Sequence, residues 1–367
     1  MTPESWRPTQ RFAWLQALRE PDRALAWSLA DWDRVVRLAR RLRLLSRLAE
    51  SLADAGLLDQ TPAPVRRHLV GEQRLSRWRT QAVTWGLDRI ESALGNAPYP
   101  RVLLKGAAYI GQGLPIAAGR LPSDLDILVP QAHLPDALAR LEQAGWSAGD
   151  VGDHDHRYYH EWSHEVPPMH HPLHRVELDL HHNILPPVAR THVDANLLLQ
   201  QLQPSRWTGW QVLDPIDQVL HSAAHLFLDS EARDRVRDLV DLDGLLRHFG
   251  AMPGFWDRLP PRAQVLGLTE ELALASHFCV EWLGTPVPES TAQAITALGP
   301  PTLRRAWLLP MLAAILTPTE PDDPPALSQG LAATLLLARY HLHRLPLRLL
   351  VPHLWHKWRA GHGGDAR

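Results

Sequence analysis

The apolar positions of the chain change their spacing twice, dividing it into a helical beginning, a short alternating middle and a helical end. Between residues 32 and 48, leucine and valine recur at helical spacing while arginines fill the other positions, so one amphipathic helix is predicted there. We interpret its basic face as solvated, with an acidic partner or RNA as the alternative. More helix is predicted up to about residue 96.

The middle of the chain alternates between apolar and polar residues in short runs bounded by Gly and Pro. The predicted elements are a strand at 101–104, a helix at 107–112, a strand at 124–129, a helix at 131–143 and a strand at 176–181. A further strand is predicted at 157–162, within a His-rich stretch that otherwise has the composition of loops.

The rest of the chain has helical spacing again. Helices are predicted at 216–228, 232–249, 270–283 and 331–345, separated by Pro and Gly. The predicted fold class is therefore α/β (α+β), a small mixed sheet flanked by helical regions. The expected division is an N-terminal helical region at 1–96, a core at 97–200, a C-terminal helical region at 201–360 and a disordered tail at 361–367.

Composition narrows the classes of protein that this chain can belong to. It is 45% hydrophobic and 21% charged with a net charge of −2, which is typical of a globular protein and makes nucleic acid an unlikely partner, although residues 1–95 carry 16 Arg against 11 Asp and Glu. The single cysteine, Cys279, excludes an internal disulfide framework. The absence of a signal-like start or a long apolar stretch predicts a cytoplasmic protein with no membrane span.

Two carboxylates on the strand at 124–129 are the first candidates for chemistry. Side chains two apart on a strand point the same way, so Asp124 and Asp126 share one face. Adjacent carboxylates repel each other, and Mg²⁺ bound through them would relieve the repulsion; a solvated strand end is the alternative. Lys105 and Gly106 stand where a strand ends and a helix begins, a place suited to phosphate. Only two of the 38 basic residues are lysine, which favours a specific role for Lys105.

The strand at 176–181 offers a third carboxylate. Glu177, Asp179 and His181 share the face opposite Val176, Leu178 and Leu180. A site for phosphoryl or nucleotidyl transfer through bound metal would need such a set of ligand-type side chains. Alternation alone does not choose between Glu177 and Asp179.

The chain resembles the bacterial nucleotidyltransferases found near lasso-peptide and exopolysaccharide gene clusters, which are related in core fold to DNA polymerase β. The resemblance rests on the following segments: Leu104-Lys-Gly-Ala-Ala108, Gly119-Arg-Leu-Pro-Ser-Asp-Leu-Asp-Ile-Leu-Val129, Leu178-Asp-Leu-His181, Asp214-Pro-Ile-Asp-Gln-Val-Leu-His221 continuing through His225, and Arg237-Asp-Leu-Val-Asp-Leu242. It covers most of the chain, and its middle block is fairly specific.

The resemblance implies a nucleotidyltransferase that uses Mg²⁺ or Mn²⁺ and an NTP donor. Asp124 and Asp126 would bind the metal, and Asp179 would complete the set. The same resemblance implies that Gly106 approaches the triphosphate and that Lys105, Arg120 and Ser123 make supporting contacts. His181, on the same strand face as Asp179, is a candidate to orient the acceptor or Asp179. The chain departs from the broader pattern at Ala107, because a serine usually follows the glycine; Ser123 is the candidate to replace its phosphate contact.

Other functions compatible with the sequence are a kinase that transfers a phosphoryl group in the same site, a non-catalytic partner protein that keeps the fold, and a metal-dependent hydrolase that uses histidines. The last rests on nine crowded histidines, namely His154, His156, His160, His164, His170, His171, His174, His181 and His182. Their spacing matches no standard zinc motif. The acceptor remains open among small molecules, peptides and proteins, in lasso-peptide or exopolysaccharide biosynthesis.

Overall fold

A computed structural model describes residues 13–149, 163–228, 233–319, 321–324, 326–344 and 350. The predicted strand at 157–162 and the tail at 361–367 lie outside these residues. The N-terminal part contains the helices α1 (Ala13–Gln16), α2 (Leu29–Arg41), α3 (Leu45–Asp54) and α4 (Ala63–Leu94). Short 3-10 helices are η2 (Pro21–Ala26), η3 (Leu58–Gln60), η4 (Pro115–Ala117) and η5 (Gln131–His133).

The middle of the chain forms a mixed sheet of seven strands in the order β3-β4-β5-β2-β1-β7-β6. Its strands are β1 (Val102–Leu103), β2 (Asp124–Leu128), β3 (Ser147–Ala148), β4 (Met169–His171), β5 (His174–His181), β6 (Gln203–Pro204) and β7 (Gln211–Val212). β2 is parallel to β5 and antiparallel to β1, and β1 is parallel to β7. The predicted α/β class with a small mixed sheet is confirmed. The sheet also continues to β7, beyond the position expected for the end of the core.

Helices follow the strands and form most of the second half of the chain. They are α5 (Lys105–Gln112), α6 (Leu134–Gln143), α8 (Ala195–Leu199), α9 (Pro215–Leu228), α10 (Val236–Phe249), α11 (Phe255–Val265), α12 (Thr269–Leu283), α13 (Glu289–Leu298), α14 (Thr302–Leu316) and α15 (Leu327–Arg344). Among the helices so described, none combines the length and apolar character needed to cross a bilayer.

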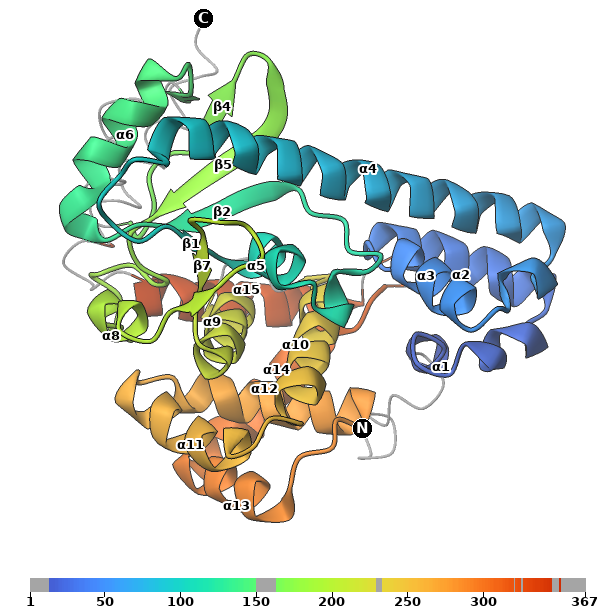
Figure 1. The fold of residues 1–367 in the computed structure, drawn as a ribbon. Coiled ribbons are helices and arrows are strands. Elements are labelled where there is room, and N and C mark those ends of the chain that lie inside the picture. The colour runs from blue at the N-terminus through green and yellow to red at the C-terminus, as the bar shows by residue number, and fades with distance from the viewer. Residues whose placement is uncertain are drawn as a thin grey trace, which may run out of the picture.

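Helices cover both faces of the sheet. The long helix α4 lies along one face, and α5, α9 and α10 lie on the opposite side (Figure 1). α4 approaches the sheet closely at Gly86, where a Cβ atom would come within 2.7 Å of the Leu125 side chain. The apolar residues of β2 and β5 therefore face α4, which leaves their polar residues facing α5, α9 and α10.

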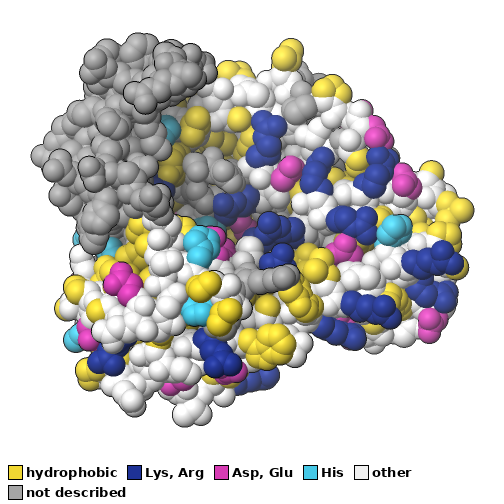
Figure 2. Space-filling model, turned by 90° about the horizontal axis from the view of Figure 1, so that it is seen from above, with side chains coloured by type: hydrophobic (Ala, Val, Ile, Leu, Met, Phe, Trp, Pro, Cys, Tyr) yellow, Lys and Arg dark blue, Asp and Glu magenta, His cyan; other side chains and the backbone are white. Residues whose placement is uncertain are grey.

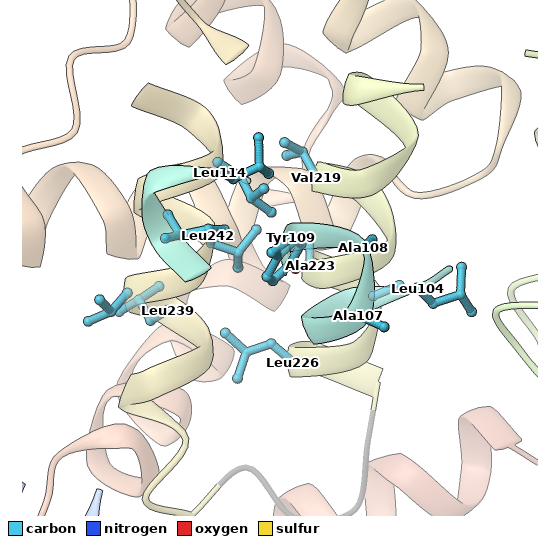
Figure 3. Close-up of a cluster of buried hydrophobic side chains, with 14 of the residues drawn as sticks. Leu104, Ala107, Ala108, Tyr109, Leu114, Val219, Ala223, Leu226, Leu239 and Leu242 are labelled. Atoms are coloured by element: carbon cyan, nitrogen blue, oxygen red, sulfur yellow. The ribbon is translucent and has the colours of Figure 1, made fainter. Parts of the chain in front are cut away.

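The side of the sheet that carries the polar residues is covered by apolar side chains that belong to the same core as those under α4. Figure 3 shows Ala107, Ala108 and Tyr109 of α5 beside Ala223 of α9 and Leu239 of α10. All five side chains are buried. α5 packs mainly against β1 and β2, so these buried residues hold the turn that begins α5 next to the strands.

The prediction of one helix at 32–48 is wrong, because α2 ends at Arg41 and α3 begins at Leu45. The chain reverses through Arg43, whose φ of 56° lies in the left-handed region. Leu42, Leu44 and Leu45 are all buried on the two sides of this turn, so the apolar spacing continues across it and conceals the break.

Basic side chains remain numerous at the surface of the N-terminal helices. Figure 2 shows many Lys and Arg side chains, with Asp and Glu between them, over the half of that face that the N-terminal helices occupy. Arg37 of α2 is typical, because it is exposed and forms ion pairs with Asp33 and Asp322. Arg37 therefore lies on a solvated face, whereas Arg47 of the same predicted face is nearly buried and pairs with Asp241.

Candidate active site

The parallel pairing of β2 with β5 brings the predicted carboxylates together. Asp126 is directly opposite Asp179, and Asp124 is opposite Glu177. Asp124, Asp126 and Asp179 line one cleft of about 480 Å³, whereas Glu177 is not among its lining residues. Glu177 instead lies 3.6 Å from the ring of His170 on β4. Asp179 therefore lies in the cleft and Glu177 does not, a distinction that the alternation of the strand could not make.

Asp126 is held between two cationic or donor groups. Lys105 Nζ donates to Asp126 Oδ1 at 2.7 Å, and His181 Nε2 lies 3.1 Å from the same oxygen. Although burial by itself raises the pKa of Asp126, Lys105 and His181 bring it well below its usual range. Asp126 is therefore a carboxylate, and His181 donates to it through Nε2–H.

Asp124 and Asp179 have no hydrogen-bond or ion-pair partner within the described parts of the chain. Burial and the nearby charges of Asp126 and Asp124 raise the pKa of Asp179 to about 7. Converging carboxylate oxygens are the ligand set that Mg²⁺ or Mn²⁺ prefers, and of these three carboxylates only Asp126 forms an ion pair with a described residue, to Lys105. These three carboxylates therefore fit the divalent ion that the fold implies.

Strained backbone is concentrated around this cleft. Among the described residues, the non-glycine residues with positive φ are Arg43 (56°), Lys105 (43°) and Asp234 (58°), and all three line it. Such conformations cost on the order of 1–3 kcal/mol each and persist where surrounding structure imposes them, often at functional sites. At Lys105 the left-handed turn joins β1 to α5 next to Asp126.

Gly106 makes room for Arg120. A Cβ atom at Gly106 would lie 2.1 Å from Arg120 Nη1, so the guanidinium occupies the space that a side chain would take. Arg120 Nε donates to Asp241 Oδ2 of α10 at 2.9 Å, and Arg47 of α3 donates to the other oxygen at 2.8 Å. Arg120 is buried and lines the cleft from beneath. We interpret Arg120 as a support for the turn at Gly106.

The cleft has a basic wall opposite the carboxylates. Arg43, Arg233 and Arg237 line it, and Ser123 is exposed at its edge. Neither Arg43 nor Arg233 forms an ion pair with any described residue, and the buried Nη1 of Arg237 has no hydrogen-bond partner. Burial and the nearby Arg237 lower the pKa of Arg43, although it remains a strong base. Free guanidinium donors of this kind suit phosphate oxygens.

We expect Arg43→Ala to weaken NTP binding about tenfold, because it removes a guanidinium that forms no ion pair with any described residue. Calorimetric titration with a non-hydrolysable NTP and Mg²⁺ measures the affinity. Arg37→Ala is the matched control, since Arg37 is an exposed arginine on α2 that lies outside the cleft. Equal NTP affinities of the two variants would show that Arg43 does not contact the nucleotide.

A second cavity of about 110 Å³ lies on the other side of Lys105. Lys105, Glu165 and His225 line both cavities. The smaller cavity is completed by mainly apolar residues, among them Ile184, Leu185, Ala224 and Leu228. The sequence did not assign roles to Glu165, Arg43 or Arg233 in this cleft, and no local signal marked them. His225 and Arg237 lay within segments that carried the family resemblance.

The fold and the polar cleft together define an α/β protein of the nucleotidyltransferase type. The chain belongs to the family described as uncharacterised nucleotidyltransferases, which matches residues 28–284. The predicted family is thus confirmed, and the match includes α2, the sheet and α10.

Other similarities are short. Two curated proteins of Salmonella paratyphi A, the cytochrome c biogenesis ATP-binding export proteins CcmA 1 and CcmA 2, are each 32% identical to this chain over 111 residues. The matched segment is 29% of this chain and 49% of theirs, so the chain spans about half the length of the curated relatives it matches. No solved structure matches the chain.

Proposed function

We propose that the protein transfers a nucleotidyl group from an NTP to an acceptor hydroxyl, using a divalent metal, and releases pyrophosphate. The observation that carries the proposal is the cleft that Asp124, Asp126 and Asp179 line together with Arg43 and Arg233. These two arginines form no ion pair with any described residue. A site for metal-bound triphosphate needs both oxygen ligands and phosphate donors. Membership of a nucleotidyltransferase family supports the general reaction type.

In this proposal, Asp124, Asp126 and Asp179 would hold Mg²⁺ or Mn²⁺, which neutralises triphosphate charge and aligns the reacting oxygen with the α-phosphorus. Lys105 and His181 position Asp126 through their contacts with Oδ1. Arg43 and Arg233 would hold phosphate oxygens.

In the proposed reaction, the acceptor oxygen forms a bond to the α-phosphorus while the bond between the α-phosphorus and the oxygen that bridges it to the β-phosphate breaks. The hydroxyl proton passes to Asp179 or to solvent.

The acceptor is proposed to be a small molecule, a peptide or a protein. Lasso-peptide or exopolysaccharide biosynthesis is the setting suggested by the resemblance. The small cavity beside Lys105 is a candidate place for the acceptor because it adjoins the metal ligands and is partly apolar.

We expect Asp124→Asn to abolish metal-dependent transfer, because the amide keeps the shape of the carboxylate but removes its charge. Glu177→Gln, which changes the register partner of Asp124 outside the cleft, is the matched control and keeps transfer. The measurement is mass spectrometry of candidate acceptors incubated with each NTP.

The mass of the product also distinguishes the competing reactions. A nucleotidyl adduct supports the proposal, and a phosphate adduct assigns the site to a kinase. If Asp124→Asn keeps full activity while Glu177→Gln is inactive, the metal ligands have been assigned to the wrong residues.

A further inference from the structure

We propose that His164, Glu165 and His181 form a second divalent-metal site, rich in nitrogen and suited to Zn²⁺, beside the carboxylate site. One ligand atom from each residue lies within 4.8 Å of the others. Glu165 Oε2 is 3.3 Å from His181 Nδ1 and 3.8 Å from His164 Nε2. Ligands of a tetrahedral zinc ion at bond lengths of about 2.0–2.1 Å lie about 3.3 Å apart, which is close to the two separations at Glu165, and binding would draw the two histidines together from a separation of at most 4.8 Å.

Buried ring nitrogens in this cluster have no hydrogen-bond partner. Nδ1 of His164 and Nδ1 of His181 are both inaccessible to solvent and make no hydrogen bond, although Nδ1 of His181 lies 3.3 Å from Glu165 Oε2. His181 is almost fully buried, with 2% of its side chain exposed. A buried imidazole nitrogen normally has a partner, because leaving it unpaired costs about 1–3 kcal/mol. A metal ion beside Glu165 would supply that partner for His181.

The other nitrogen of His181 already has the contact that a metal-binding histidine requires. Its Nε2 is 3.1 Å from Asp126 Oδ1. Ligating histidines usually donate their second N–H to a carboxylate, which fixes the tautomer and leaves the first nitrogen free for the metal. Asp126 would therefore serve both sites, as a ligand of the carboxylate site and as the carboxylate that orients His181.

The proposed zinc site keeps one position open. Two histidines and one glutamate are three protein ligands, a number typical of zinc sites that leave the fourth position to water or substrate. Glu165 and His164 line the 110 Å³ cavity, which would supply that position. His225 also lines it, but its Nε2 lies 3.0 Å from Arg235 Nη1 and is therefore occupied. A substrate oxygen bound there would lie near Lys105.

The test uses the full chain, stripped of metal with a chelator and titrated with Zn²⁺ in excess Mg²⁺. We expect one equivalent of Zn²⁺ to bind, and Co²⁺ in its place to give the visible absorption of a four- or five-coordinate ion. Glu165→Gln and His164→Ala should each weaken Zn²⁺ binding by more than about 100-fold, since even outer partners of a zinc ligand are worth about 10–100-fold.

His170→Ala is the matched control because His170 also lies beside a glutamate, Glu177, but on the exposed strand β4. It should leave Zn²⁺ binding unchanged, as should Asp179→Asn. Zinc lost in Asp179→Asn but kept in Glu165→Gln would assign the ion to the carboxylate site and overturn the proposal, as would no zinc bound at all. Because the readout is metal binding, it stands apart from the activity test of nucleotidyl transfer.

Discussion

Asp126→Asn is expected to abolish transfer and also to lower the free energy of unfolding by about 3–5 kcal/mol, the usual cost of removing one partner of a buried ion pair. Asp126 pairs with Lys105, whose ammonium lies in the interior of the site, and accepts from His181. Although burial lowers the pKa of Lys105, Asp126 raises it above its ordinary value overall. Without Asp126, a buried cation would remain without its nearest counter-charge.

Denaturant unfolding of wild-type and variant protein measures this change, and Lys105→Met provides the second arm of a double-mutant cycle. The double variant Lys105→Met with Asp126→Asn should recover part of the lost stability, because it removes both members of the pair. If Asp126→Asn unfolds at the same denaturant concentration as the wild type, the ion pair does not contribute as described.

The opposite change in stability is expected for Asp179→Asn, which should also abolish transfer. The pKa of Asp179 is raised to about 7 in the folded protein, above the ordinary value of 3.8. An acid with a raised pKa destabilises the folded state once it is ionised, so wild-type stability falls as pH rises from about 4 to 7. The variant lacks this loss, and we expect it to be about 1–3 kcal/mol more stable at pH 8 without metal.

Unfolding of metal-free protein at pH 4 and pH 8 tests this prediction. The two proteins should differ little at pH 4 and most at pH 8, and Mg²⁺ should reduce the difference by neutralising the carboxylates in the wild type. A difference that is independent of pH would mean that the charge of Asp179 is not its cause.

Local patterns in the sequence predicted the elements that carry the carboxylates. Alternation placed Asp124 with Asp126 on one face of a strand, and Asp179 with His181 on another. Alternation within a strand does not predict its register with the neighbouring strand, and it is this register that sets Asp126 opposite Asp179. Family resemblance made the choice of Asp179 over Glu177 where the periodicity could not.

The basic wall and the histidine cluster could not be predicted in this way. Arg43 faces the cleft only because the chain turns between α2 and α3, and the uninterrupted leucine spacing hides that turn. Glu165 reaches His181 across 16 positions in the sequence, through an isolated bridge between the two residues. The position of Arg43 and the contact between Glu165 and His181 both depend on tertiary packing, which a short stretch of sequence does not predict.

The position of Asp241 bears on the order in which the protein can mature during synthesis. Arg47 and Arg120, both buried or nearly so, share this one carboxylate, from which they are separated by 194 and 121 positions in the chain. A ribosome that has released only the sheet has therefore produced two internal guanidinium groups without their counter-ion. Burial of unpaired charge is strongly unfavourable, so a nascent chain ending at the last strand would remain loosely packed around Gly106. The cleft thus acquires its final form only after α10 has left the exit tunnel.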